Sequence, residues 1–147
     1  MSIKDMLNRD MKAALKEGDK DRLSVIRMAR SAILYAEKER LHELNDGEVI
    51  EVLSREVKKL KDDRDEFERL GRIEQAQKLG QEIEILMSYL PQQLSDDELE
   101  KLVRQTIIEV GAKSAKDMGR VMSAIMPKIR GRADGRAVNA LVKKLLQ

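Results

Sequence analysis

The sequence of 147 residues contains no cysteine and no tryptophan, and it has one histidine, two tyrosines and one phenylalanine. The absence of cysteine excludes disulfides, thiolate metal sites and cysteine nucleophiles, and it favours a reducing compartment. Because His42 is the single histidine, a metal site would need carboxylates alone, and activation of a nucleophile by histidine is almost excluded. The shortage of aromatic side chains also disfavours RNA-binding modules that stack bases on them.

Long hydrophobic segments are missing as well. The longest uninterrupted apolar run covers five residues, 32–36, which is far too short for a membrane helix. The first ten residues lack the apolar core of a signal peptide. We therefore expect a soluble, cytoplasmic protein without a membrane partner.

Helix-forming residues and helical periodicity dominate what is present. Leu, Ala, Glu, Lys, Arg and Met are abundant, and no strand-like alternation extends beyond a few residues. Apolar positions recur at helical spacing in seven segments, so the predicted fold class is all-α. The expected helices cover, approximately, residues 3–17, 20–44, 48–70, 73–89, 96–110, 114–126 and 135–145.

Proline and capping signals divide the chain into two predicted domains. Pro91 forbids continuation of the fourth helix, and Ser95 with Glu98 fits a capping box that starts the fifth. We therefore expect an N-terminal domain of about four helices, residues 1–92. A small C-terminal three-helix bundle, residues 93–147, follows it.

The formal net charge of +2 hides an uneven distribution of charge along the chain. Residues 1–110 carry 20 basic and 25 acidic side chains, whereas residues 111–147 carry nine basic and two acidic ones. Clustered positive charge attracts polyanions such as RNA. The alternative interpretation is a solubilising surface, because Lys and Arg near helix C-termini also favour the helix dipole.

Six basic residues form the candidate RNA-binding site. They are Lys116, Arg120, Lys128, Arg130, Arg132 and Arg136. Lys116 and Arg120 lie one turn apart on the sixth expected helix and share a face. The next three alternate along an expected loop around Gly131, and Arg136 lies on the seventh helix. Gly119 and Gly131 would let a partner approach the backbone closely.

Other polar clusters favour ordinary helix surface. An acidic run follows a group of lysines on the third expected helix: Lys58, Lys59 and Lys61, then Asp62, Asp63, Asp65 and Glu66. Each lysine lies four residues before an aspartate, which predicts ion pairs on a solvated face rather than a metal or acid–base site. Arg22, Arg27 and Arg30 could serve a groove between helices, although surface ion pairs are the simpler interpretation. We predict no catalytic residue, no metal site and no cofactor.

Four segments resemble the YqeY-like proteins of the GatB/YqeY family. They are GRIEQAQKLGQE at 71–82, YLPQQL at 89–94, KDMGRVM at 116–122 and KIRGRADG at 128–135. The last two are also similar to the tail domain of the B subunit of the tRNA-dependent amidotransferase. That resemblance implies a helical appendage that helps to hold tRNA at its outer corner. It implies no chemistry here, because transamidation belongs to other domains and to a partner amidase subunit.

These observations predict a non-catalytic accessory protein. Its partner would be tRNA or a tRNA-associated enzyme, held through the basic C-terminal domain by folded shape and phosphates rather than splayed bases. The alternative is a protein–protein adaptor that docks through exposed Met or Leu on the last two helices, or through the arginine face of the second. Glutamine-dependent amidotransferase activity, the label that the family carries, is the least favoured function.

Overall fold

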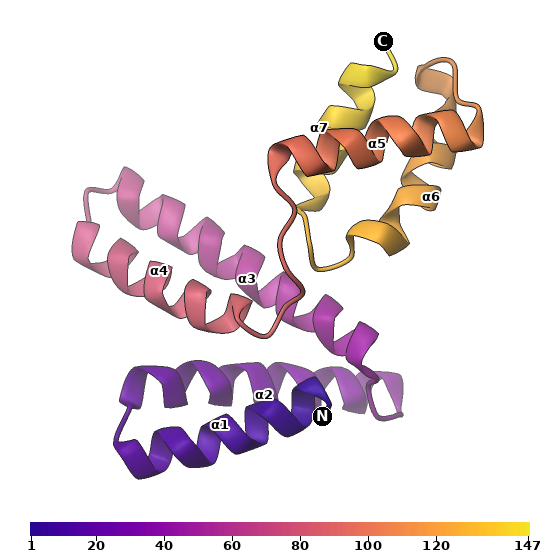
Figure 1. Cartoon of the computed structure of the whole chain (residues 1–147). Helices are drawn as coiled ribbons and strands as arrows, with labels where there is room; N and C mark the ends of the chain where they lie inside the picture. Colours follow the sequence, from indigo (N-terminus) through magenta and orange to yellow (C-terminus); the bar gives the residue numbers. More distant parts are fainter. The chain divides into compact units, whose positions relative to one another are not determined.

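A computed structural model describes all 147 residues, which form helices and connecting turns without strands (Figure 1). The all-α prediction is confirmed. Seven α-helices and one short 3-10 helix, η1, follow in the order α1 (Ile3–Glu17), α2 (Lys20–Arg40), α3 (Asp46–Arg69), α4 (Ile73–Met87), α5 (Asp96–Val110), η1 (Ala115–Asp117), α6 (Met118–Ile129) and α7 (Gly135–Leu145). None of them combines the length and apolar composition that crossing a bilayer requires.

The chain divides into two compact units, Met1–Leu90 with α1–α4 and Pro91–Gln147 with α5–α7. This division lies two residues before the predicted boundary at 92/93. Three hydrogen bonds, which we call the linker clasp, join the start of the second unit to its α6–α7 loop. Gln92 O accepts from Arg132 Nε at 3.1 Å, Gln93 Nε2 donates to Gly131 O at 2.6 Å, and Leu94 N donates to Arg132 O at 2.8 Å. Independent folding of the two units stays a prediction.

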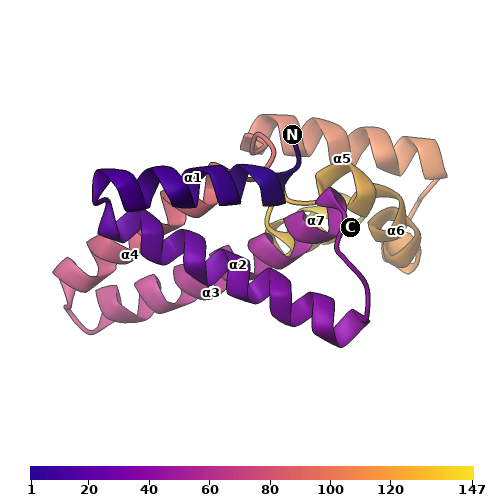
Figure 2. The ribbon, with the colours of Figure 1, turned by 90° about the horizontal axis from the view of Figure 1, so that it is seen from below.

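The N-terminal unit consists of two helical hairpins. In both views α1 lies alongside α2, and α3 alongside α4 (Figures 1 and 2). Their apolar faces share one core, whose most deeply buried members are Leu7, Val25, Ile26, Ala29, Val49, Leu53 and Leu86. Burying each larger side chain of this kind contributes about 1.5–3 kcal/mol. Helical spacing of the apolar residues therefore accounts for the packing of all four helices.

Capping residues set several helix starts. Ser2, Asn45 and Ser95 each form a complete capping box with the acidic residue three positions later, and Asp134 accepts a hydrogen bond from Arg136 N at 3.0 Å. The caps predicted at Ser2, Ser95 and Asp134 are confirmed. Asn45, predicted to belong to a turn, caps α3 and starts it two residues earlier than expected.

The C-terminal unit has a separate core and one departure from the predicted helices. Val121, Ile125 and Ile129 of α6 pack with residues of α5 and α7. The predicted end of α6 before Pro127 is wrong, because the helix continues to Ile129. Proline removes one backbone donor, and the carbonyl it leaves unpaired lies on exposed Ser123, where water can satisfy it. Burial of Ile129 favours the extra turn.

Three leucines expected to face inward are exposed instead: Leu15, Leu41 and Leu70. Leu41 departs furthest, since it is 89% exposed and occupies the left-handed C-cap position of α2 with φ of 61°. It is the only residue other than glycine with positive φ. Such a conformation costs a leucine about 1 kcal/mol or more.

Candidate nucleic-acid interface

Five of the six predicted cations lie at or just beyond the two ends of α6, and Arg136 lies in the first turn of α7. Lys116 lies on η1 and Arg120 on the first turn of α6, whereas Lys128 lies on its last turn. Arg130 and Arg132 follow in the loop. Two expectations are corrected: Lys116 precedes α6, and Lys128 is helical rather than part of the loop. Arg120 and Lys128, the nearest members of the two groups along α6, are eight residues apart, which is about 12 Å along the helix axis.

Asp117 organises the first group. Its carboxylate accepts from Lys113 N at 2.9 Å and from Arg120 Nη1 at 3.2 Å. The backbone hydrogen bond from Lys113 is the main cause that lowers the pKa of Asp117, and the Arg120 guanidinium adds to it. Arg120 also donates to the carbonyl of Val110 at the end of α5. Arg120 therefore fastens α5 to α6, while the exposed Lys116 ammonium has no carboxylate partner.

Two cations of the second group hold the unit together. Lys128 Nζ pairs with Glu109 of α5 at 2.9 Å, and Arg132 Nε donates to Gln92 O in the linker clasp. Gly131 adopts φ of 73°, which is a left-handed conformation that glycine adopts without strain.

Other cations of the C-terminal unit are open to solvent. Arg130 and Arg136 are exposed. The backbone N–H of Arg136 donates to the capping Asp134, and its side chain forms no ion pair. Lys143 and Lys144 are also exposed in the last turn of α7. No ion pair that holds the fold together therefore involves the side chains of Arg136, Lys143 or Lys144.

Gly119 lies in an open part of the surface. A Cβ added there would meet nothing within 4 Å, so packing within the protein does not require glycine. Its suggested role, close approach of a partner, stays a prediction.

Acidic clusters offer no metal site. No three of the carboxylate and histidine side chains converge so that they could hold an ion. The predicted pairs between the α3 lysines and the aspartates four residues later do not form. Lys59 Nζ instead lies 3.4 Å from Glu56, and Arg64 Nε lies 3.7 Å from Asp65. One partner of each pair, Lys59 or Asp65, is largely exposed, so water competes with each ion pair.

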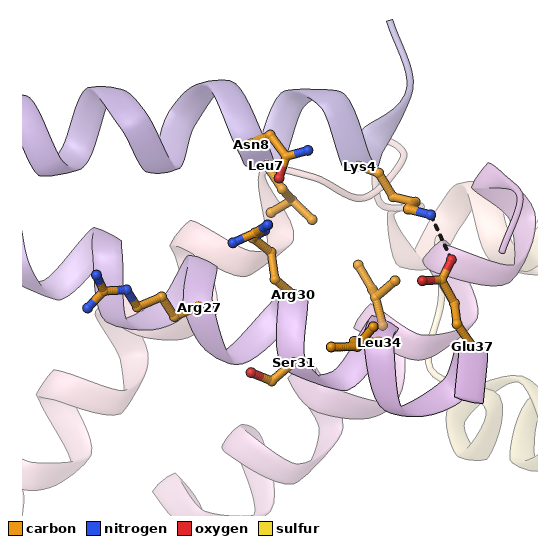
Figure 3. Close-up of a pocket in the computed structure, with 9 residues that line it drawn as sticks. Lys4, Leu7, Asn8, Arg27, Arg30, Ser31, Leu34 and Glu37 are labelled. Atoms are coloured by element: carbon orange, nitrogen blue, oxygen red, sulfur yellow. Dashed lines mark hydrogen bonds and ion pairs between the residues drawn. The ribbon is translucent and has the colours of Figure 1, made fainter. Parts of the chain in front are cut away.

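A groove of about 390 Å³ lies between α1 and α2 in the N-terminal unit (Figure 3). Leu7, Ile33 and Leu34 supply apolar lining, and Arg27 and Arg30 supply positive charge. The sequence groups these arginines with Arg22 as a possible groove. Arg22 instead pairs with Asp19 at 3.6 Å and does not line the hollow. Sequence reasoning missed the α1 residues, such as Leu7, that complete the groove.

Comparisons with known proteins agree with the fold and the motifs. A family profile described as "Yqey-like protein" matches residues 4–146. The E subunit of glutamyl-tRNA(Gln) amidotransferase from Thermococcus gammatolerans is 41% identical over 58 residues, 37% of this chain and 9% of that protein. The corresponding protein of Sulfurisphaera tokodaii is 42% identical over 67 residues, 43% of this chain and 10% of that protein.

A third relative aligns over more of its length. Altered inheritance of mitochondria protein 41, mitochondrial, of Pyrenophora tritici-repentis is 26% identical over 131 residues, 86% of this chain and 71% of that protein. By contrast, the chain spans only about a tenth of the length of the amidotransferase subunits that it matches.

Proposed function

The chain belongs to the YqeY-like protein family, and from that premise we propose that it is a non-catalytic accessory protein that binds tRNA or a tRNA-associated enzyme. The C-terminal unit would make the contact. The single observation that carries this proposal is its charge: residues 111–147 have nine basic and two acidic side chains, in a unit whose sequence motifs resemble a tRNA-contacting tail. The names of the amidotransferase relatives support a tRNA context.

The contacts within the unit sort the six candidate cations into two roles. Arg120, Lys128 and Arg132 hold α5, α6 and the linker in place. Their main role would therefore be to maintain the shape of the binding surface, and contact with RNA would be a minor one. Lys116 and Arg136 are exposed and form no ion pair, so they would contact phosphates directly. Arg130, exposed in the loop, would join them.

The low aromatic content of the chain favours recognition of the folded shape of the RNA over recognition of individual bases. The C-terminal unit contains no aromatic side chain, so unpaired bases have no surface on which to stack. Phosphate contacts would then supply most of the affinity. Each phosphate contacted lowers log K by about 0.7–0.9 per log unit of salt.

A fluorescence titration of the full chain with total tRNA tests the proposal. We expect binding at micromolar protein and low salt, and a steep loss of affinity as salt rises. Replacing Lys116, Arg130 and Arg136 by alanine in one triple variant should weaken binding at least tenfold. The slope of log K against log salt should become shallower by the amount expected for the loss of about two to three phosphate contacts. Total tRNA that fails to bind at micromolar protein and low salt contradicts the proposal.

A matched control removes three charges from the other unit. Lys12, Lys58 and Lys78 are exposed and form no ion pair, so their alanine variants should bind tRNA like the wild type. Equal losses in both triple variants would mean that total charge, not the C-terminal surface, drives binding.

The competing hypothesis is that the purified protein itself catalyses amidation of tRNA-bound amino acids. The proposal assigns no reaction to the chain. Incubation of the purified protein with misacylated tRNA, glutamine and ATP should therefore leave the aminoacyl group unchanged. Amidated product in the absence of other subunits would replace the accessory function with an amidotransferase activity.

A further inference from the structure

The groove between α1 and α2 holds two cations that have no carboxylate partner. Arg27 and Arg30 line it from α2, and both side chains are exposed. Arg30 Nη1 lies 3.0 Å from the sulfur of Met11, which is an uncharged and weak acceptor. Figure 3 shows Arg30 extending from α2 toward Asn8 of α1. The strongest donors of the groove therefore lack a strong acceptor within the protein.

Two neutral side chains add to this excess of donors. Asn8 lines the groove from α1 and Ser31 lines it from α2. Both are exposed, and neither side chain forms a hydrogen bond within the protein. An amide NH2 and a hydroxyl can each donate to an oxygen atom of a ligand. Both walls of the groove thus present donors that the fold does not use.

The other end of the groove is satisfied within the protein. Lys4 Nζ and Glu37 Oε2 form an ion pair at 2.6 Å, and Glu37 also accepts from Leu44 N at 2.9 Å. The hydrogen bond with Lys4 is the main cause that lowers the pKa of Glu37. Because Glu37 is the only carboxylate in the lining and is paired, the excess positive charge of the groove lies at its arginine end.

The groove is positive although the unit that contains it is not. Three basic side chains and one acidic side chain line the groove, which gives a net charge of +2. Residues 1–90 as a whole carry 18 basic and 20 acidic side chains, a net charge of −2. A long polyanion such as RNA would meet acidic surface beyond the groove, whereas a small anion would meet only the arginine end. Charge complementarity therefore favours a small anionic ligand.

We propose that this groove binds a small organic phosphate monoester. Near neutral pH such a ligand carries a charge of about −2 and three acceptor oxygens on its phosphate, which match the net charge and the unused donors of the groove. A carboxylate brings half that charge and two oxygens. Arg27 and Arg30 are exposed and lie about one helical turn apart, so both guanidinium groups can turn toward one phosphate.

The organic part of the ligand would lie against Leu34. This side chain lines the groove and is 52% exposed, so a ligand can cover it without disturbing the core. The volume of the groove, about 390 Å³, falls within the range of about 300–1,000 Å³ that small-molecule sites occupy. The inference concerns the N-terminal unit and is independent of tRNA binding by the C-terminal one.

Three small probes test the groove: phenyl phosphate, inorganic phosphate and benzoate. Each is titrated into the ¹⁵N-labelled full chain at constant ionic strength and neutral pH, followed by NMR. Phenyl phosphate should give saturable shifts in α1 and α2 with a Kd of about 1 mM. Benzoate, which has the same ring and a single charge, should bind at least about fivefold more weakly. Inorganic phosphate should bind about threefold more weakly because it cannot cover Leu34.

Variants of the chain separate the charge of the groove from its shape. Arg27→Gln with Arg30→Gln should weaken phenyl phosphate about tenfold or more. The matched control is Arg55→Gln with Lys58→Gln, an exposed pair at the same spacing on α3, which should bind like the wild type.

Two single variants test the opposite wall and the apolar contact. Asn8→Ala should weaken phenyl phosphate about threefold, because one donor of α1 is lost. Alanine favours the helix more than asparagine does, so that loss cannot come from misfolding. Leu34→Ala should weaken phenyl phosphate but leave the affinity for inorganic phosphate unchanged.

Several results would overturn the inference. They are an absence of saturable shifts at about 10 mM phenyl phosphate, equal binding of phenyl phosphate and benzoate, or equal effects of the two double variants. Full affinity in Asn8→Ala would place the anion outside the groove. Shifts of the α1 and α2 amides by tRNA would assign the groove to RNA instead. Shifts by phenyl phosphate that are confined to α1 and α2 and lost with the arginines support the inference, whether or not tRNA binds the C-terminal unit.

Discussion

Replacing Tyr89 with phenylalanine removes a hydrogen bond between the end of α4 and α1. The Tyr89 hydroxyl donates to Asp10 Oδ2 at 2.5 Å, and the tyrosine is only 5% exposed. Hydrogen bonds to charged groups contribute about 1.5–3 kcal/mol. Asp10 keeps a second donor, Arg9 Nε at 3.0 Å, and a quarter of its side chain reaches water. We therefore expect a loss near the lower limit, about 1.5–2 kcal/mol.

The loss should depend on pH in a defined way. The hydrogen bond from Tyr89 lowers the pKa of Asp10, so the stabilisation is complete above the unfolded pKa, about 4, and falls as pH drops through the folded one. Burial, reinforced by Asp10, raises the pKa of Tyr89. That stabilisation is complete below the unfolded pKa of about 10 and is lost as pH rises further. Wild type and variant should differ most between these limits.

Urea unfolding followed by circular dichroism, at pH 3, 7 and 10.5, measures this difference. Asp10→Asn serves as the second arm of a double-mutant cycle, with an expected coupling of about 1 kcal/mol at pH 7. The reasoning is refuted if Tyr89→Phe costs less than about 0.5 kcal/mol at pH 7. A cost that is the same at pH 3 and pH 7 would refute it equally.

Four other perturbations address the backbone at two positions, the second core and the division of the chain. Leu41→Gly should raise the free energy of unfolding by about 0.5–1 kcal/mol, because it removes left-handed strain from an exposed side chain; a destabilised variant in urea would contradict this. Gly131→Val should cost more than about 1 kcal/mol, whereas Lys128→Ala loses one exposed ion pair worth about 0–1 kcal/mol; equal thermal midpoints would show that the loop tolerates a side chain. Ile125→Ala should cost about 2–4 kcal/mol in the C-terminal unit alone. Tyrosine fluorescence should stay unchanged there, since Tyr35 and Tyr89 both belong to the other unit. Fragments 1–90 and 91–147 should each be helical by circular dichroism, and a cut at 92/93 should destabilise the second because it removes the Gln92 carbonyl from the linker clasp.

Local signals predicted much of the fold because they act within one turn of helix. A serine at the start of α1 or α5 bonds to an amide three residues later, and no distant contact is needed for that bond. The inward residues of each helix follow from spacing in the same way. These features depend on neighbouring residues, which the sequence displays directly.

Features that depend on distant residues were misjudged. Pro127 marks a helix end by local rules, yet burial of Ile129 against the other helices extends α6 past it. Leu41 matches the apolar period of α2, but the helix ends one residue earlier and the side chain turns to water. In both cases the tertiary environment decides where the last turn ends.

In the candidate site, too, sequence reasoning could not identify contacts between distant residues. Charge clustering located the basic segment, but it could not separate cations that bind the protein from those that face solvent. Arg120 reaches the end of α5, and Lys128 reaches Glu109. Both partners lie ten or more positions away in the sequence, and nothing in the spacing of the basic residues indicates them.

The linker clasp has a consequence for proteolysis. A protease must draw an extended stretch of chain into its active site, and the linker at 92–94 is held by a loop about forty residues away. Cleavage there therefore requires the α6–α7 loop to open first, so the nicking rate measures how often that loop opens. A ligand that closes over Arg130 should then protect the linker from cleavage without touching it.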